Sequence, residues 1–228
     1  MNDLLVAAVF FVGTHLGIAG TQLRSQVIER VGAGLYRLLY SLISIVALFW
    51  MIDAWQDAPF RPYWHAGAAA AHLPLLVMPV ALVLIVGGLT SANPTAVGQA
   101  PDPDTAEPAR GMLRVTRHPV MWAIGLWGIA HMLANPDLAS LIFFGSFALL
   151  ALVGCHSLDA RRHRDPPPGW GVFVQQTSFL PFVAIIERRQ KFVWGEIGLW
   201  RIGLALAIYL LLLFVHPWLF GAVVLPGG

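Results

Sequence analysis

Three histidines lie within apolar segments of this sequence, where an imidazole can act as a ligand for a metal or a cofactor. His118 and His131 share the run from 111 to 135, GMLRVTRHPVMWAIGLWGIAHMLAN, and His15 interrupts the first apolar segment. Inside a membrane an ionisable side chain is costly and usually functional. We therefore interpret these histidines as candidate ligands. The alternative is a histidine that packs between helices and hydrogen-bonds to a neighbouring polar group.

His15 and His131 are the strongest candidates for metal ligands. His15 lies about 11 residues, or roughly 16 Å, into the first apolar segment, and three nearby glycines would let a helix or a flat ligand approach closely. His131 has Trp127 one turn before it and Asn135 one turn after it. These neighbours could stack on the imidazole and hydrogen-bond to it.

A second candidate site contains Arg117, His118 and Asp159. His118 stands between Arg117 and Pro119, an arrangement typical of a helix start with proline in its first turn. Because His118 and His131 are about 20 Å apart along a helix, they cannot serve one site. We predict that Arg117, His118 and Asp159 bind an anionic cofactor group at the cytoplasmic ends of the fourth and fifth helices. The alternative role for His118 is an interfacial helix cap.

The composition identifies the environment of these residues. Hydrophobic residues make up 57% of the 228 residues and charged residues only 11%, with a mean hydropathy of +0.70, whereas a soluble domain has about 25% charged residues. The single cysteine excludes an intramolecular disulfide. The sequence has no phosphate-binding glycine loop, dinucleotide fingerprint or nucleophile elbow. We predict an integral membrane protein.

The predicted fold is an all-α polytopic membrane helix bundle that forms a single domain over residues 1–228. A membrane-spanning helix needs about 20 mostly apolar residues, and about six segments qualify. The stretch Trp170–Ile186 contains glutamines and a proline, so we expect an interfacial or re-entrant element there. The predicted spans are Leu4–Leu23, Leu35–Met51, Ala69–Leu89, His118–Ala134, Leu138–Leu158 and Leu199–Gly221.

The basic residues predict the orientation in the membrane. Of the 14 lysines and arginines, all but Arg61 follow the first, third or fifth predicted helix. The positive-inside rule then places both termini outside the cytoplasm. The linker Thr90–Pro108, rich in proline and aspartate, becomes a mobile cytoplasmic connection. The pI of about 9.0 follows from this topology, so we expect no nucleic-acid partner.

Several motifs resemble the NnrU family of bacterial membrane proteins. They are THLGIAGTQLR from Thr14, VGAGLYRLLYSLISIVALF from Val31, RHPVMWAIGLWGIAHMLANPD from Arg117 and SLDARR from Ser157. That family is named for denitrification, which implies a link to nitrite or nitric oxide reduction. It is also similar to plastid zeta-carotene isomerases, which are haem b membrane enzymes.

The resemblance implies a bacterial inner-membrane protein that binds haem b. The histidines assigned to haem in the isomerase correspond to His15 and His131, and two imidazoles from separate helices are a sound way to hold haem iron. The implied activity is redox-dependent and isomerase-like, on a hydrophobic substrate such as a polyene or quinone. Simple depth estimates place His131 about 10 Å nearer the outer surface than His15.

Two other functions compete with this interpretation. The Arg-His-Pro sequence resembles isoprenylcysteine carboxyl methyltransferases, in which such groups bind S-adenosylmethionine, with Arg117, His118 and Asp159 as counterparts. Those enzymes carry a glutamate pair after the helical hairpin, whereas here Asp159 is followed by two arginines. The second alternative is a non-enzymatic assembly partner of respiratory enzymes.

Overall fold

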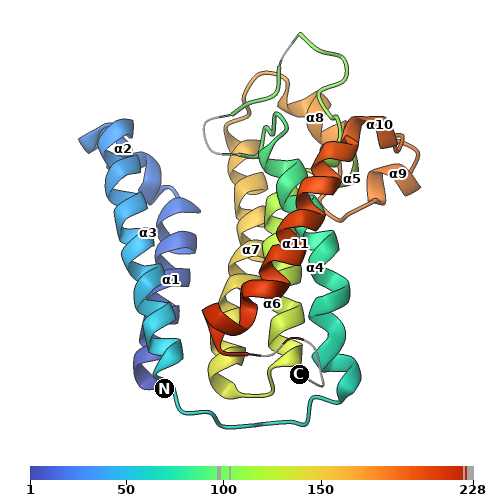
Figure 1. The fold of residues 1–228 in the computed structure, drawn as a ribbon. Helices are drawn as coiled ribbons and strands as arrows, with labels where there is room; N and C mark the ends of the chain where they lie inside the picture. Colours follow the sequence, from blue (N-terminus) through green and yellow to red (C-terminus); the bar gives the residue numbers. More distant parts are fainter. Residues whose placement is uncertain (97–98, 103, 223, 225–228) are drawn as a thin grey trace. The chain divides into compact units, whose positions relative to one another are not determined.

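The computed structural model describes residues 1–96, 99–102, 104–222 and 224, and no strand occurs in these ranges. The chain divides into two compact units, Met1–Pro74 with Ile124–Pro167 and Leu75–Ala123 with Pro168–Gly228. Figure 1 shows the helices of the chain, coloured along the sequence. The predicted all-α fold is therefore confirmed.

The first unit contains the N-terminal helices, most of α6 and all of α7. Its helices are α1 (Asn2–Thr14), η1 (His15–Ala19), α2 (Leu23–Val31), α3 (Ala33–Gln56), α6 (Pro119–Ala134) and α7 (Leu138–Arg164). The second unit contains the end of α4 (Ala68–Leu89), the first turn of α6, and α5 (Met112–Val115), α8 (Trp170–Gln176), α9 (Val183–Ile186), α10 (Trp194–Ile197) and α11 (Leu199–Phe220).

The core of the first unit lies between α1, α3 and α7. Leu4 and Phe11 of α1 are buried against Met51 of α3 and Phe143 of α7. Gly128 brings α6 close to α7, because a Cβ atom there would lie 2.8 Å from the Phe144 backbone oxygen. Small residues permit such close helix contacts in membrane proteins.

In the second unit, α4 packs against α11. Leu82 and Val86 of α4 pack against Ala205 of α11. At the end of α4, the Arg201 guanidinium donates hydrogen bonds to the side-chain and backbone oxygens of Thr90, at 2.8 and 3.1 Å. These contacts fix the start of α11 beside the loop that leads to α5.

Four helices are long and apolar enough to cross a membrane, namely α3, α4 from Ala69, α7 and α11. Segments Asn2–Ile18 and Leu23–Val31 give a fifth candidate if they form one span, bent by 78°. The 16-residue α6 is shorter than the usual 20 or so. The chain is therefore a multi-pass membrane protein, but the predicted count of six spans is not confirmed.

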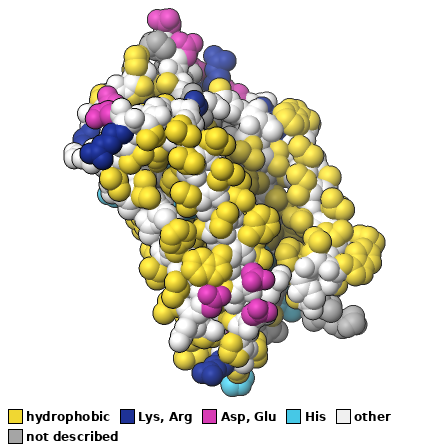
Figure 2. Space-filling model, turned by 90° about the vertical axis from the view of Figure 1, so that its left-hand side faces the viewer, with side chains coloured by type: hydrophobic (Ala, Val, Ile, Leu, Met, Phe, Trp, Pro, Cys, Tyr) yellow, Lys and Arg dark blue, Asp and Glu magenta, His cyan; other side chains and the backbone are white. Residues whose placement is uncertain are grey.

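The exposed surface agrees with a lipid environment. Large apolar side chains such as Leu38, Val46 and Phe49 of α3 are exposed. Figure 2 shows hydrophobic side chains over most of the face it presents, with charged side chains gathered toward the ends. Extensive exposed hydrophobic surface of this kind is typical of proteins that contact lipid.

Two predicted irregular regions have the expected local structure. Trp170–Ile186 forms two short helices, α8 and α9, separated by residues 177–182, so it is not one continuous helix. The described residues of the linker Thr90–Pro108 form no helix. The positions of both regions relative to the membrane, and the single-domain organisation, stay predictions.

Candidate functional site

His15 stands at the first position of the π-helical turn η1. Such turns are rare and often occur at functional sites. The imidazole Nδ1 lies 2.7 Å from the Phe11 backbone oxygen, and the ring contacts the rings of Phe11 and Tyr40, with centroids 4.5 and 5.5 Å away. Because a carbonyl oxygen can only accept, Nδ1 carries the proton and Nε2 keeps its lone pair.

His131 has the same local arrangement on α6. Its Nδ1 lies 2.9 Å from the Trp127 backbone oxygen, and its ring lies 5.5 Å from the Trp127 ring and 5.2 Å from the Phe144 ring. The predicted aromatic neighbour is therefore present. Asn135 differs from the prediction, because its amide donates to the His131 backbone oxygen, 2.7 Å away.

Aromatic rings connect the two histidines within the first unit. Phe11, which contacts His15, lies 5.4 Å from Phe147 of α7. Phe147 lies 5.1 Å from Trp127, which contacts His131. Sequence reasoning missed Phe147, because the apolar pattern of α7 does not show which of its phenylalanines face α1 and α6. The structure thus places both predicted metal ligands on one aromatic cluster.

In the second unit, Arg117 and His118 precede the first residue of α6, Pro119, as predicted. The Arg117 backbone N–H donates to the Ser178 oxygen at 3.0 Å, and the Thr116 hydroxyl and Trp122 indole both donate to the Phe179 oxygen at 2.8 Å. His118 is only 1% exposed. The ring of Phe179, which lies between α8 and α9, is 6.0 Å from the His118 ring.

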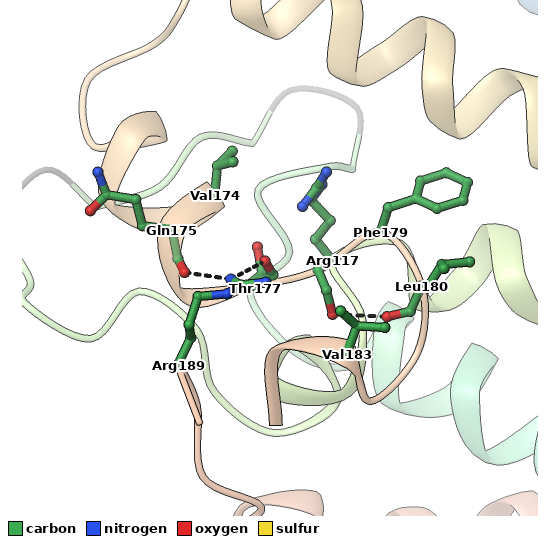
Figure 3. A pocket seen from close by; sticks show the side chains of 9 residues that line it. Arg117, Val174, Gln175, Thr177, Phe179, Leu180, Val183 and Arg189 are labelled. Atoms are coloured by element: carbon green, nitrogen blue, oxygen red, sulfur yellow. Dashed lines mark hydrogen bonds between the residues drawn. The ribbon is translucent and has the colours of Figure 1, made fainter. Parts of the chain in front are cut away.

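Arg117 lines a pocket of about 620 Å³ in the second unit, formed mainly by residues 174–183 together with Arg189. The Arg189 guanidinium donates to the backbone oxygens of Gln175 and Thr177, at 2.6 and 2.9 Å. Figure 3 shows this guanidinium directed at those two residues, while the Arg117 side chain lies on the Phe179 side. The pocket therefore combines apolar walls with two arginines.

Asp159, the third predicted cofactor-binding residue, belongs to the first unit. It is buried on α7, and its backbone oxygen lies 2.7 Å from the His163 Nδ1. Arg117 and His118 belong to the second unit. Their predicted association with Asp159 therefore stays a prediction.

An ion pair between the buried Arg114 and the partly exposed Glu196, in the second unit, was not predicted from the sequence. The Arg114 guanidinium donates to both carboxylate oxygens of Glu196, at 2.6 and 2.7 Å, and the Gly111 N–H donates to the same carboxylate at 2.8 Å. Gly111 has a φ of +58°, a backbone conformation that favours glycine. The hydrogen bond from Arg114 holds the pKa of Glu196 below its usual value, and the same bond raises the pKa of Arg114.

The described residues contain no group of three or more His, Cys, Asp or Glu side chains that could hold a metal ion. A haem iron needs only one or two protein ligands, because the porphyrin supplies four nitrogens. The predicted haem therefore depends on His15 and His131, the two separate histidines on the aromatic cluster.

The helical architecture and apolar surface define the chain as a multi-pass helical membrane protein. A family model described as NnrU protein matches residues 3–224, and the chain belongs to the NnrU family. The 15-cis-zeta-carotene isomerase of the Zea mays chloroplast is 26% identical over 194 residues, which cover 82% of this chain and 51% of that enzyme. The chain thus spans about half the length of this curated relative. No solved structure matches the chain.

Proposed function

We propose that the protein binds haem b through His15 and His131 and acts as an isomerase-like enzyme on a hydrophobic substrate in the membrane. One observation carries this proposal: histidines from two separate helices contact the same aromatic cluster. In both, the imidazole Nδ1 lies against the backbone oxygen of the residue four positions earlier. The similarity to a carotene isomerase supports a polyene as the substrate class. A quinone is the other hydrophobic candidate.

Several features of these residues support a haem site. In each histidine the Nδ1–H bond to a carbonyl orients the ring and leaves the lone pair on Nε2, as metal-ligating histidines require. Phe11 and Trp127 supply apolar surroundings, and near His15 a Cβ atom on Gly13 or Gly17 would meet nothing within 4 Å. Bound haem would supply a Lewis acid or a one-electron couple beside the substrate.

The chain itself contributes positioning and the exclusion of water. The carbonyls of Phe11 and Trp127 fix the two imidazoles, and Phe147 closes the aromatic cluster between α1 and α6. A dry, apolar site suits a substrate that enters from lipid, since a polyene or quinone offers few groups for hydrogen bonding.

Absorption spectroscopy tests the haem ligands. Protein expressed with ample haem and purified in detergent should show a low-spin b-type spectrum, because two imidazoles give a strong ligand field. His15→Ala and His131→Ala should each convert this spectrum to high spin or abolish it. Added imidazole should restore the low-spin form, which separates loss of a ligand from misfolding. Replacement of the exposed loop residue His65 by alanine is the matched control.

Two results would refute the haem proposal. One is a wild-type protein that binds no haem, and the other is a low-spin spectrum that survives both histidine substitutions. S-adenosylmethionine binding, measured by calorimetry, would then test the methyltransferase-like alternative, for which we propose Arg117, His118 and Asp159 as binding residues. Co-purification with respiratory enzymes would test the assembly-partner alternative and the link to denitrification.

The substrate class has a direct test. Haem-loaded protein, reduced and incubated with 15-cis-zeta-carotene, should convert the 15-cis double bond to trans, as separated by chromatography. The His15→Ala protein should not. Absence of conversion by the haem-loaded wild type would remove this polyene as a substrate, and reduction of a quinone would then be measured with the same preparations.

A further inference from the structure

A row of buried hydroxyl groups follows α3 beside His15. Tyr36, Tyr40 and Ser44 are spaced by four residues, so they share one face of the helix. Their oxygen atoms are buried. The Tyr40 and Ser44 hydroxyls interact with each other, whereas the Tyr36 hydroxyl has no hydrogen-bond partner among the described residues. Tyr36 is only 7% exposed. A buried hydroxyl without a partner is unfavourable, so the Tyr36 hydroxyl favours a polar ligand group at this place.

The row connects His15 to a cation. The Tyr40 ring meets the His15 ring edge-on at 5.5 Å and stacks on Tyr36 at 5.6 Å. The Arg24 guanidinium of α2 lies over the Tyr36 ring, 5.7 Å from its centroid. The site therefore begins at a candidate haem ligand, passes from Tyr40 to Tyr36 one helical turn nearer the start of α3, and ends at the positive charge of Arg24.

Further positive charge comes from α7. Arg161 is close enough to both Arg24 and Tyr36 for their electrostatic interactions to be appreciable. On α2, η1 and these ends of α3 and α7, arginines outnumber carboxylates, which are the exposed Glu29 and the buried Asp159. Guanidinium and phenol groups together are good donors to a carboxylate.

We propose that Arg24, Arg161, Tyr36 and Tyr40 form a carboxylate-binding site for an amphipathic ligand whose apolar part lies beside His15. The inference rests on the proposed function, and the carboxylate is then a haem propionate. The phenol hydroxyls and the Arg24 guanidinium donate hydrogen bonds to it. A fatty-acid carboxylate is the other source of the same chemistry.

Iron-free protoporphyrin IX separates this site from the histidine ligation. It carries both propionates but no iron, and its binding in detergent can be followed by quenching of tryptophan fluorescence. Arg24→Gln should weaken binding of the diacid by about tenfold and Tyr36→Phe by about threefold, as expected for hydrogen bonds to a charged group. Binding of the porphyrin dimethyl ester should be the same in all variants.

Arg30→Gln is the matched control, because Arg30 is an exposed arginine in the last turn of the same helix. It should bind the diacid like the wild type. Equal binding of diacid and diester by the wild type, or equal losses in Arg24→Gln and Arg30→Gln, would overturn the proposal. Thermal unfolding of each variant checks that the fold is retained, and Tyr36→Phe changes only one oxygen atom.

The two proposals can fail separately. If the wild type shows no haem spectrum but its preference for the diacid depends on Arg24, the haem function fails and the carboxylate site stands. If His15→Ala abolishes the low-spin spectrum but Arg24→Gln leaves diacid binding unchanged, the carboxylate site fails and the haem function stands. Oleate that binds in an Arg24-dependent way, without such dependence for the porphyrin diacid, would overturn the propionate assignment in favour of a fatty acid.

Discussion

The two units position their candidate site residues by different means. In the first unit, aromatic rings and closely packed helices surround His15 and His131. In the second unit, hydrogen bonds between loop segments hold Arg117, and the Arg114–Glu196 pair joins two distant stretches of chain. The comparison indicates that packing positions the candidate residues of the first unit, whereas hydrogen bonds and an ion pair position those of the second.

Loss of the Arg114–Glu196 ion pair should have the largest effect, and it should appear in the second unit. Glu196→Ala removes the bidentate partner of Arg114, whose side chain is 8% exposed. Gln190 and the exposed Glu107 stay as partners, so we expect a cost of about 2–3 kcal/mol, typical of hydrogen bonds to a charged group. We expect that loss in the free energy of unfolding in detergent. Hydrogen exchange should rise in residues 107–117 and 190–197.

Glu187→Ala is the control for this variant, because Glu187 pairs with Arg189 at an exposed position. Such pairs contribute about 0–1 kcal/mol, so this variant should unfold almost like the wild type. Equal free energies of unfolding for the Glu196 and Glu187 variants would contradict the comparison of the two units. The Arg114–Glu196 ion pair would then not stabilise the second unit.

Gly128 provides the corresponding test of the first unit. In Gly128→Ala the new Cβ would meet backbone atoms of Phe144 and Ala148 at 2.8 and 3.1 Å, and such overpacking costs about 1–3 kcal/mol. The loss should appear in the free energy of unfolding. Gly17→Ala, where a Cβ meets nothing within 4 Å, should be neutral or stabilising. A Gly128 variant as stable as the Gly17 variant would contradict close packing of α6 on α7.

Acid should weaken the second unit through Glu196. Its pKa is lowered in the folded protein, chiefly by the hydrogen bond from Arg114. The stabilisation is therefore complete above the ordinary glutamate pKa of about 4.3 and is lost as the pH falls through the lower folded pKa. The change should be smaller than in Glu196→Ala, because a protonated carboxyl still accepts hydrogen bonds. Unfolding curves of Glu196→Gln should lack this pH dependence, and an identical dependence would assign it to another group.

Arg117→Lys should have the smallest effect. The positive charge is kept but the planar fork is lost, and the propionate site that we propose lies in the first unit. Haem content, measured by absorbance per protein, should stay within about twofold of the wild type, a free-energy change below about 0.5 kcal/mol. A large loss of haem would instead place a propionate in the second unit beside Arg117. Weaker S-adenosylmethionine binding would support the methyltransferase-like alternative.

The sequence predicted the features that depend on local pattern. The apolar runs indicated the helices, and the Arg-His-Pro sequence indicated the start of α6 at Pro119. His15 and His131 could be singled out because ionisable side chains are unusual in apolar segments. The predicted first span differs because residues 15–19 form a π-turn and the chain bends before α2.

Long-range pairings could not be predicted in this way. Arg114 and Glu196 are 82 residues apart, and no periodicity relates them. The contact of Phe147 with both Phe11 and Trp127 depends on how α7 is rotated about its axis. The hydroxyl row on α3 is periodic, but a helix of mostly apolar residues does not show from sequence alone which side is buried.

The π-turn at His15 also affects how this part of the chain can vary in length. Each residue of an α-helix advances about 100° around the axis, so the wider turn shifts the phase of everything that follows it. Because a π-turn accommodates one extra residue, a single-residue deletion between Thr14 and Gly20 would restore regular winding and keep Phe11 on the same face of the helix. A change to regular winding at the same chain length would instead rotate Phe11 by about 100°. In alignments of related sequences, gaps of one residue at this turn would therefore mark members whose first helix is regular.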